Sequence, residues 1–414
     1  MGAIPAGHGA TNLWSGESGL IEAHIHEWLH LLLRWIHFIV GVAWIGASFY
    51  FNWLENNLDR ADRGDERIAG DLWAIHGGGI YYLKKYQSRP QSLPPVLHWF
   101  KWEAYSTWLS GVSLLIVVYY VNASNFMTDD SVMALSSTMA IGIGLSALVA
   151  SWLFYDVSCR SFLKDWPRLL GILIFAWFAL LAWVLSECLS PRAAYIHVGA
   201  AIGTVMVANV FFVIIPSQRE LVKALTANQE PDPRFGKNGL LRSRHNNYLT
   251  LPVLFIMISG HFPGTYGSPQ QWLVLSGVAA VGVLARHYFN IRGRVRGAAI
   301  WLAIAFAGFV LMIWLTRPVQ NEHTVSADVS SVSDDEALKI SQQRCASCHS
   351  PNPTQDGFTQ PPLGIELDSV AKLRQHKTAV HRTSVSSHYM PLGNLTNMTA
   401  QERIILGQWI EAQP

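Results

Sequence analysis

Eight long apolar runs constrain the fold of this 414-residue chain more than any other feature. Each run is close to the roughly 20 residues with which a helix crosses about 30 Å of hydrocarbon. Half of the residues are hydrophobic and 14% are charged, a balance typical of membrane proteins. We therefore expect an all-α, polytopic membrane helix bundle of about eight transmembrane helices. The runs cover residues 29–53, 104–121, 133–156, 169–189, 194–215, 247–262, 270–289 and 298–316.

Positive charge lies almost entirely on one side of these runs. The loops 54–103, 157–168, 217–245 and 286–297 carry 20 Lys and Arg residues, whereas the alternate loops carry only Arg192. By the positive-inside rule the basic loops face the cytoplasm. With eight spans, both the N-terminus and the C-terminus are then expected outside the plasma membrane, in the periplasm.

The segment Cys345-Ala346-Ser347-Cys348-His349 has the C-x-x-C-H pattern of c-type haem attachment. Cys345 and Cys348 would form thioethers to the porphyrin, and His349 would be the proximal iron ligand. Met390, in a Pro- and Gly-rich stretch, is the expected second axial ligand, as in cytochromes c. Other side chains that could take this second position are Met398, His376, His381 and His388.

A zinc or redox pair is the alternative use of C-x-x-C, but the chain has neither a second C-x-x-C nor a βαβ pattern around this one. We therefore predict a small class I cytochrome c domain at 337–414, a transmembrane domain at 1–317, and a polar linker at 318–336 between them. Because a covalent haem belongs to an oxidising compartment, the haem motif independently predicts a periplasmic C-terminal domain.

Histidines inside the apolar runs are the next candidates, since ionisable groups within a membrane are expensive and commonly functional. His37 shares a helical face with His30, and His197 on the fifth run is expected at a similar depth. We expect His37 and His197, or one of them with His30 or His261, to ligate a non-covalent haem. The predicted cofactors are then one covalent haem c and one or more haem b. The alternative is a packed histidine bonded to a neighbouring helix.

The basic loop 54–103 holds a candidate substrate site. Three glycines after His76 would let backbone N–H groups approach a ligand, and Lys101 would attract an anion. His98 and Glu103 are suited to moving a proton. The alternative is an interfacial aromatic belt with positive-inside lysines. His245 and His287, with the amides Asn246 and Asn247, are further residues that could join this cluster.

Six ordered segments together resemble one family. They are Arg34-Trp35-Ile36-His37 with Gly41 to Gly46, His76-Gly77-Gly78-Gly79, Trp102-Glu103-Ala104-Tyr105, Asn209-Val210-Phe211-Phe212 with Pro216, His245-Asn246-Asn247-Tyr248 with Leu251-Pro252, and Met390-Pro391-Leu392-Gly393-Asn394. With the haem motif, the chain resembles the bacterial membrane-bound urate oxidases, or urate hydroxylases, that carry a fused C-terminal cytochrome c domain.

The resemblance implies an oxidoreductase that converts urate to 5-hydroxyisourate in purine catabolism. Electrons would leave through the haem c domain to a respiratory-chain cytochrome or terminal oxidase, without release of hydrogen peroxide. It also implies a multi-pass protein of the bacterial inner membrane, with urate and membrane lipid as partners and no nucleic acid. The residues leave open the side from which urate enters and the oligomeric state.

Two other classes of function compete with this interpretation. An electron-transfer subunit from quinol to cytochrome c, with no organic substrate of its own, would be reduced by quinol and not by urate. A solute transporter with a regulatory cytochrome is the third possibility, although the eight runs show no obvious inverted repeat.

Overall fold

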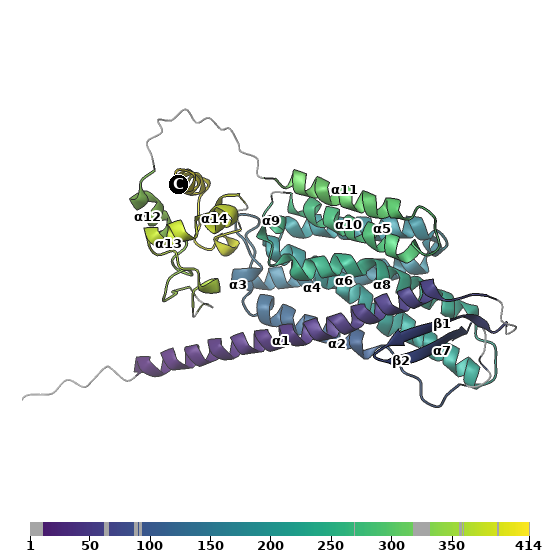
Figure 1. Cartoon of the computed structure of the whole chain (residues 1–414). Coiled ribbons are helices and arrows are strands. Elements are labelled where there is room, and N and C mark those ends of the chain that lie inside the picture. The colour runs from purple at the N-terminus through teal and green to yellow at the C-terminus, as the bar shows by residue number, and fades with distance from the viewer. Residues whose placement is uncertain are drawn as a thin grey trace, which may run out of the picture.

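The computed structural model describes residues 11–61, 66–86, 90, 93–268, 270–317, 332–355, 358, 360–386 and 389–413, and for 11–23 it describes the backbone only. A bundle of long helices makes up most of the molecule, and a small helical domain lies at one end of it (Figure 1). The chain is therefore mostly helical.

The bundle contains every apolar run named above. Its α-helices are α1 (Thr11–Asn57), α2 (Trp102–Leu114), α3 (Ala123–Phe126), α4 (Ser137–Arg160), α5 (Pro167–Ser186), α6 (Pro191–Ala208), α7 (Ile215–Thr226), α8 (Pro233–Ser259), α9 (Pro263–Tyr266), α10 (Gln271–Ile291) and α11 (Ala299–Leu315). Three other helical turns are the π-helices η1 (Leu115–Tyr120) and η3 (Asn209–Ile214) and the 3₁₀-helix η2 (Phe162–Asp165).

Five stretches among the described residues are long and apolar enough to cross a membrane by themselves. They are His24–Asn57, Ser137–Arg160, Pro167–Ser186, Pro191–Thr226 and Gln271–Ile291. Helix α11 is apolar but shorter. The run 104–121 lies on α2 with η1. The run 247–262 begins on α8, which polar residues extend back to Pro233.

Helix starts follow the sequence closely. Ser136 caps α4 by accepting a hydrogen bond from the Met139 N–H, and Ser190 caps α6 in the same way. Proline follows directly after the Ser190 cap, where its missing N–H has no cost and its fixed φ suits the first helical position. These short polar residues therefore decide where each long apolar segment begins to be helical.

Helices α6, η3 and α7 run on without a break from Pro191 to Thr226. Pro216 sits in this stretch, where it has no N–H for the carbonyl four residues back and its ring would clash with that carbonyl. The helix forms a wider π turn just before Pro216, in which the Ile215 N–H bonds to the Val210 carbonyl, five residues back. Such π turns are frequent at functional sites, and this one carries Asn209 and Phe212.

The core of the bundle lies between α4, α5, α6 and α8. Small residues allow close helix approach there: a Cβ at Gly199 of α6 would lie 2.5 Å from Ile256 Cγ2 of α8. At Gly199 the neighbour is another helix.

We expected a purely helical membrane part, but the loop 54–103 contains two β-strands. Strands β1 (Ile68–His76) and β2 (Gly79–Tyr86) form an antiparallel hairpin in which His76 pairs with Gly79. Gly77 and Gly78 form its turn with φ of +57° and +80°. A two-residue hairpin turn of this hand needs positive φ at both positions, which glycine adopts without strain. The turn alone therefore accounts for two of the three glycines.

The C-terminal domain is a separate small helical unit with its own core. Its elements are α12 (Asp334–Arg344), η4 (Pro362–Gly364), α13 (Val370–Gln375), α14 (Lys377–Val380), η5 (His381–Ser386), η6 (Leu392–Asn394) and α15 (Ala400–Glu411). Leu373, Leu406 and Trp409 are fully buried at its centre. Helix α12 begins inside the stretch expected as linker, and residues 318–331 of that stretch lie outside the described residues.

The two ends of the bundle differ in charge and in what they contact. The loops 54–103, 157–168, 217–245 and 286–297 meet at one end, here called the basic end, which carries the β-hairpin and α7 (Figure 1). The C-terminal domain lies at the opposite end, beside α3 and α9 (Figure 1).

Candidate functional site

Three of the four predicted catalytic residues lie at or just before the start of α2, and two of them are close to each other. His98 Nε2 lies 4.0 Å from Glu103 Oε1, and the Lys101 ammonium lies 5.8 Å from the centre of the Trp102 ring. Glu103 Oε2 is buried and has no hydrogen-bond partner among the described residues. The fourth residue, His76, is exposed beside the hairpin turn. Within the described residues, no side-chain hydrogen bond or ion pair links it to the other three.

A chain of buried polar side chains lies deeper in the basic end. Asn209 donates one hydrogen bond to the Tyr155 hydroxyl, at 2.9 Å, and another to Asn246 Oδ1, at 2.8 Å. Because its oxygen already accepts from Asn209, the Tyr155 hydroxyl is placed to donate to His245 Nδ1, at 2.8 Å. Tyr155 is 1% exposed and Asn209 is fully buried. A network this well paired rigidifies the helices that contribute to it.

The amides and histidines near α8, which could have joined the Glu103 cluster, therefore have other partners. The His245 ring lies with Tyr155, and Asn246 bonds to Asn209. Asn247 accepts from Arg286, while His287 pairs with Tyr248. The orientation of α8 about its own axis decides which partner each residue meets, since residues three or four apart share a face and neighbouring residues do not.

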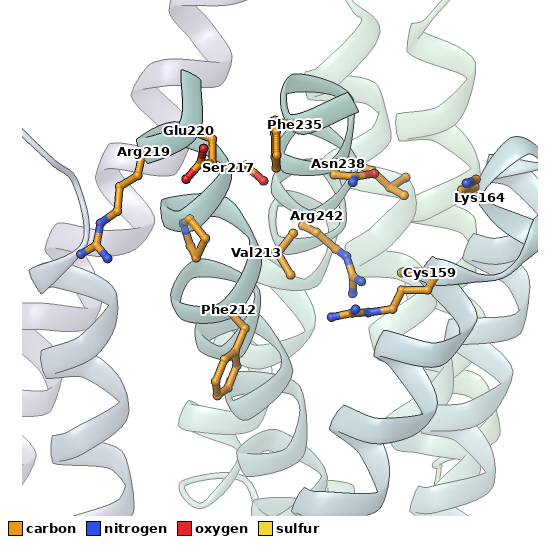
Figure 2. A pocket seen from close by; sticks show the side chains of 13 residues that line it. Cys159, Lys164, Phe212, Val213, Ser217, Arg219, Glu220, Phe235, Asn238 and Arg242 are labelled. Atoms are coloured by element: carbon orange, nitrogen blue, oxygen red, sulfur yellow. The ribbon is translucent and has the colours of Figure 1, made fainter. Parts of the chain in front are cut away.

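An open cavity of about 570 Å³ lies between α4, α7 and α8 (Figure 2) and adjoins the Tyr155 chain. Its volume is in the range of small-molecule sites. The residues that line it are Cys159, Arg160, Lys164, Phe212, Val213, Pro216, Ser217, Arg219, Glu220, Phe235, Asn238, Leu241 and Arg242. Four of these side chains are cationic, and Glu220 is the one carboxylate among them.

Arg242 connects the cavity to the buried chain. It is 3% exposed, donates to Asn209 Oδ1 at 3.3 Å and forms an ion pair with Asp156 at 2.7 Å. Cys159 in the cavity wall lies 3.7 Å from His245 Nδ1. Tyr155, Asp156 and Arg242 were not predicted from the sequence. The available signal was the spacing of Arg242, His245 and Asn246, which places an arginine on the same helical face as two residues already singled out.

The two histidines predicted to ligate haem b lie against different helices. His37 Nδ1 donates to the Thr107 carbonyl at 3.0 Å, and a Cβ at Gly111 would lie 3.0 Å from its ring. His197 is fully buried, with Nδ1 donating to the Ala193 carbonyl at 2.8 Å and Nε2 3.3 Å from the Tyr120 hydroxyl.

The surroundings of His197 do not fit a haem ligand. A Cβ at Gly144 would lie only 2.5 Å from its Nε2, so α4 occupies the space that a porphyrin would need. Both ring nitrogens also have protein partners already. This is the arrangement of a packed histidine, the alternative that the sequence analysis left open. His30 differs, because its Nε2 is buried and has no hydrogen-bond partner in the part of the chain that the structure describes.

The residues predicted to hold haem c come together in the C-terminal domain. Cys345 is buried in the core, Cys348 is half-buried, and neither forms a disulfide. His349 Nδ1 lies 2.9 Å from the Ile365 carbonyl, which only accepts. Nδ1 therefore carries the hydrogen, and Nε2 keeps the lone pair that an iron ligand requires. This donor set fits a covalently attached haem.

Burial raises the pKa of the Cys345 thiol to about 11 and raises the pKa of the Cys348 thiol as well. A redox-active C-x-x-C has the opposite property, because the protein lowers the pKa of the attacking thiol.

The loop that carries Met390 is fixed by the domain around it. The Met390 N–H donates to the Thr383 carbonyl at 2.8 Å, and Arg403 donates to the Met390 carbonyl at 2.6 Å. Met398, the alternative methionine, is 3% exposed and belongs to the domain core. His376 and His381 lie on other segments, with His381 3.6 Å from Glu411, and His388 lies outside the described residues.

The Met390 loop also makes the contact between the two domains. Tyr389 packs on the bundle core, its ring centre 5.1 Å from that of Tyr266. Gly393, at φ +55°, approaches α3 so closely that a Cβ there would lie 2.8 Å from the Thr128 carbonyl. The bundle therefore contacts the face of the C-terminal domain that presents the predicted second axial ligand.

A family model described as urate oxidase N-terminal matches residues 23–317. The match spans the bundle from α1 to α11, with the cavity, the Tyr155 chain and the Glu103 cluster, and it stops before the C-terminal domain. No curated protein and no solved structure matches the chain.

Proposed function

Because the chain belongs to the urate oxidase N-terminal family, we propose that it is a membrane-bound urate oxidase with its own cytochrome c domain. The helical domain, 1–317, would convert urate to 5-hydroxyisourate. The C-terminal domain, 337–414, would take up the electrons and pass them to a respiratory-chain cytochrome or terminal oxidase, so that no hydrogen peroxide forms. The apolar helices are compatible with a membrane protein, and the charge distribution favours an inner-membrane location with the C-terminal domain in the periplasm.

The observation that carries the electron-transfer part is the orientation of His349. Its Nδ1 is engaged by the Ile365 carbonyl, so the ring presents Nε2 next to two unpaired cysteines in a C-x-x-C-H segment. Cys345 and Cys348 would attach a haem c, with His349 and Met390 as the iron ligands. When bound, the haem iron accepts one electron at a time.

The overall reaction fixes what the helical domain must handle. Urate and one water give 5-hydroxyisourate, two protons and two electrons, so the site needs proton acceptors as well as an electron outlet. Two successive one-electron transfers per urate follow from one haem c. The side chains at the start of α2 are suited to the proton part of this task.

Glu103 is the strongest candidate base among the predicted catalytic residues. Its Oε2 is buried without a partner, a costly state that a ligand N–H would relieve. His98, 4.0 Å from the other carboxylate oxygen, could relay the proton to solvent, and Lys101 could attract the urate anion. His76 remains a proposed catalytic residue, although no side chain among the described residues bonds to it. The interfacial-belt interpretation of this loop predicts instead that none of these substitutions changes catalysis.

A haem b at His37 and His197 is not part of the proposed mechanism. His197 does not fit, because both of its ring nitrogens have protein partners and α4 packs against its Nε2.

Urate-dependent reduction of the C-terminal haem tests the proposal. Anaerobic membranes containing the full chain are mixed with urate, and the reduced c-type spectrum is followed together with 5-hydroxyisourate and peroxide. We expect haem reduction and product without peroxide. An unchanged haem spectrum with urate, together with reduction by quinol, would instead support the electron-transfer subunit.

A further inference from the structure

We propose that a cluster of basic groups at the end of the bundle opposite the basic end binds the phosphate of an anionic phospholipid. The cluster consists of His30 and Arg34 of α1, Tyr119 of η1 and Arg192 of α6, and is here called the outer cluster. This inference goes beyond the proposed function. It takes from that proposal only the placement of the bundle in a membrane, with the C-terminal domain on the periplasmic side.

One face of α1 is directed at η1. His26, His30 and Arg34 follow one another at intervals of four residues, so they share this face. His26 Nε2 lies 3.0 Å from the Val117 carbonyl of η1. The next two side chains on the same face, His30 and Arg34, are therefore held on the side of η1 as well.

Arg192 of α6 approaches η1 from another direction. Its guanidinium lies 5.7 Å from the centre of the Tyr119 ring and 5.9 Å from that of Phe126. Phe126 belongs to α3, beside which the C-terminal domain lies (Figure 1). Arg34 and Arg192 are near enough for their charges to repel each other, and both charges act on His30. Two permanent positive charges thus meet at one place.

The outer cluster lacks a counter-charge. Within the described residues, the electrostatic neighbours of the two guanidinium groups are each other and tyrosines. Three buried polar atoms of the cluster also have no hydrogen-bond partner in this part of the chain: His30 Nε2, the Tyr119 hydroxyl and Arg192 Nε. Tyr119 is only 4% exposed. Unpaired polar atoms are costly in an apolar interior, and a ligand with several acceptor oxygens would relieve all three.

Depth in the membrane favours a lipid headgroup as this ligand. Arg34 lies five residues after the start of the apolar run 29–53, about 8 Å along the helix axis, and Arg192 lies just before the run 194–215. A long cationic side chain at this level extends its charge towards the headgroups. A guanidinium binds a phosphate through two parallel N–H donors, so the chemistry of the two arginines matches a phosphodiester.

The surface of α1 beside the outer cluster suits acyl chains. Leu31, Trp35 and Phe38 are each more than half exposed and follow a helical spacing, on a stripe next to that of His30 and Arg34. Little of α1 is buried inside the protein. Free phosphate would use the charges but not this apolar stripe, so the two sources of a phosphate group can be distinguished.

The test counts the phosphatidylglycerol molecules that the full chain retains in a neutral detergent, by native mass spectrometry. The basic end also attracts anionic headgroups, so the number of bound lipids is the measured quantity. We expect Arg34→Gln to weaken one site about tenfold, since hydrogen bonds to charged groups contribute about that much. This variant should carry one lipid fewer at the lowest concentration that fills the original protein. Arg34 is exposed, so its replacement should leave the fold intact.

Arg317→Gln is the matched control. Arg317 is exposed, follows α11 on the same expected side of the membrane and packs on Trp314, away from the outer cluster. A lone exposed charge of this kind is screened by solvent, so this variant should retain every lipid that the original protein retains.

His30→Phe tests the outer cluster without removing a permanent charge. The substitution deletes the unpaired Nε2 and keeps a planar ring, so the fold should hold. We expect the same phosphatidylglycerol site to weaken several-fold, because one donor to the phosphate is lost. Phosphatidylcholine, whose quaternary ammonium cancels the charge of its phosphate, should bind equally to all of these proteins.

The outcomes decide between the possible ligands. Equal numbers of phosphatidylglycerol molecules on the original protein, Arg34→Gln and Arg317→Gln would overturn the lipid site. Displacement of the one lipid by equimolar inorganic phosphate would assign the outer cluster to the free anion, and displacement by equimolar urate would assign it to the substrate. Either result would overturn the lipid as its ligand. Whether urate reduces the haem is measured separately, so failure of the lipid site leaves the proposed function standing.

Discussion

Replacing Gly144 by alanine should destabilise the bundle, because the His197 ring packs directly against Gly144 of α4. A Cβ at this position would lie 2.5 Å from His197 Nε2 and 2.6 Å from its Cδ2. The ring has little room to move, since His197 is fully buried and its Nδ1 is bonded to the Ala193 carbonyl.

The expected cost follows from three contributions. Overpacking of a well-packed interior costs about 1–3 kcal/mol. A displaced ring also loses the Tyr120 hydroxyl, 3.3 Å away, worth about 1 kcal/mol. Alanine recovers about 1 kcal/mol through its higher helix propensity. The net loss for Gly144→Ala is therefore about 1–3 kcal/mol of unfolding free energy.

Gly142→Ala is the matched control on the same helix. No atom lies within 4 Å of a Cβ at Gly142, so only the propensity gain of about 1 kcal/mol applies. Thermal unfolding of the detergent-solubilised full chain, followed by thiol-reactive fluorescence, should rank Gly142→Ala above the original protein and Gly144→Ala below it. Equal midpoints for the two variants would refute the packing argument and reopen the space beside His197 to a larger ligand.

Four further predictions concern the haem groups, the proton acceptor and acid stability. Replacing both Cys345 and Cys348 by serine should abolish covalent haem staining on a denaturing gel, whereas Met390→Ala should keep the stain and lower the reduction potential, because a thioether ligand raises it. A pyridine haemochrome assay should show the same haem content in His197→Ala as in the original protein, and a selective loss of haem b would contradict this. Glu103→Gln should slow urate-driven haem reduction about 100-fold, with urate affinity little changed, and an unchanged rate would favour the interfacial-belt interpretation. Burial acts to raise the pKa of Glu402, but hydrogen bonds from Thr399 and Arg344 lower it overall. The stabilisation that the Glu402 carboxylate gives the folded protein is therefore complete above about pH 4.5. It is lost as the pH falls through the lower pKa that Glu402 has in the folded state. Glu402→Gln should accordingly cost about 1 kcal/mol at pH 7 and nothing near pH 2 in acid-titrated unfolding, and an equal cost at both pH values would exclude the carboxylate as the source.

Local chemistry explains why the sequence predicted the helices so well. Apolar length, Ser caps and prolines at helix starts act over a few residues, so Ser136 and Ser190 mark helix starts without any tertiary information. The haem motif is equally local, because Cys345, Cys348 and His349 lie within one turn of chain. The same approach missed the hairpin, although Gly77-Gly78 between aromatic and β-branched residues is a turn signal, because the glycines were interpreted as a ligand cradle.

The candidate site was decided by contacts between helices distant in sequence, which a single sequence does not contain. His245 could have faced Glu103 or Tyr155 by its position along α8 alone, and the rotation and packing of that helix chose Tyr155. Arg242, Asp156 and Asn209 come from three separate helical segments, and only their packing joins them. The sequence by itself therefore determined the helical architecture, and it predicts the topology from charge and the haem attachment segment, since each depends on neighbouring residues. The tertiary structure decided which buried polar groups meet, because unpaired polar groups are costly in an apolar interior and each must find its partner across helices.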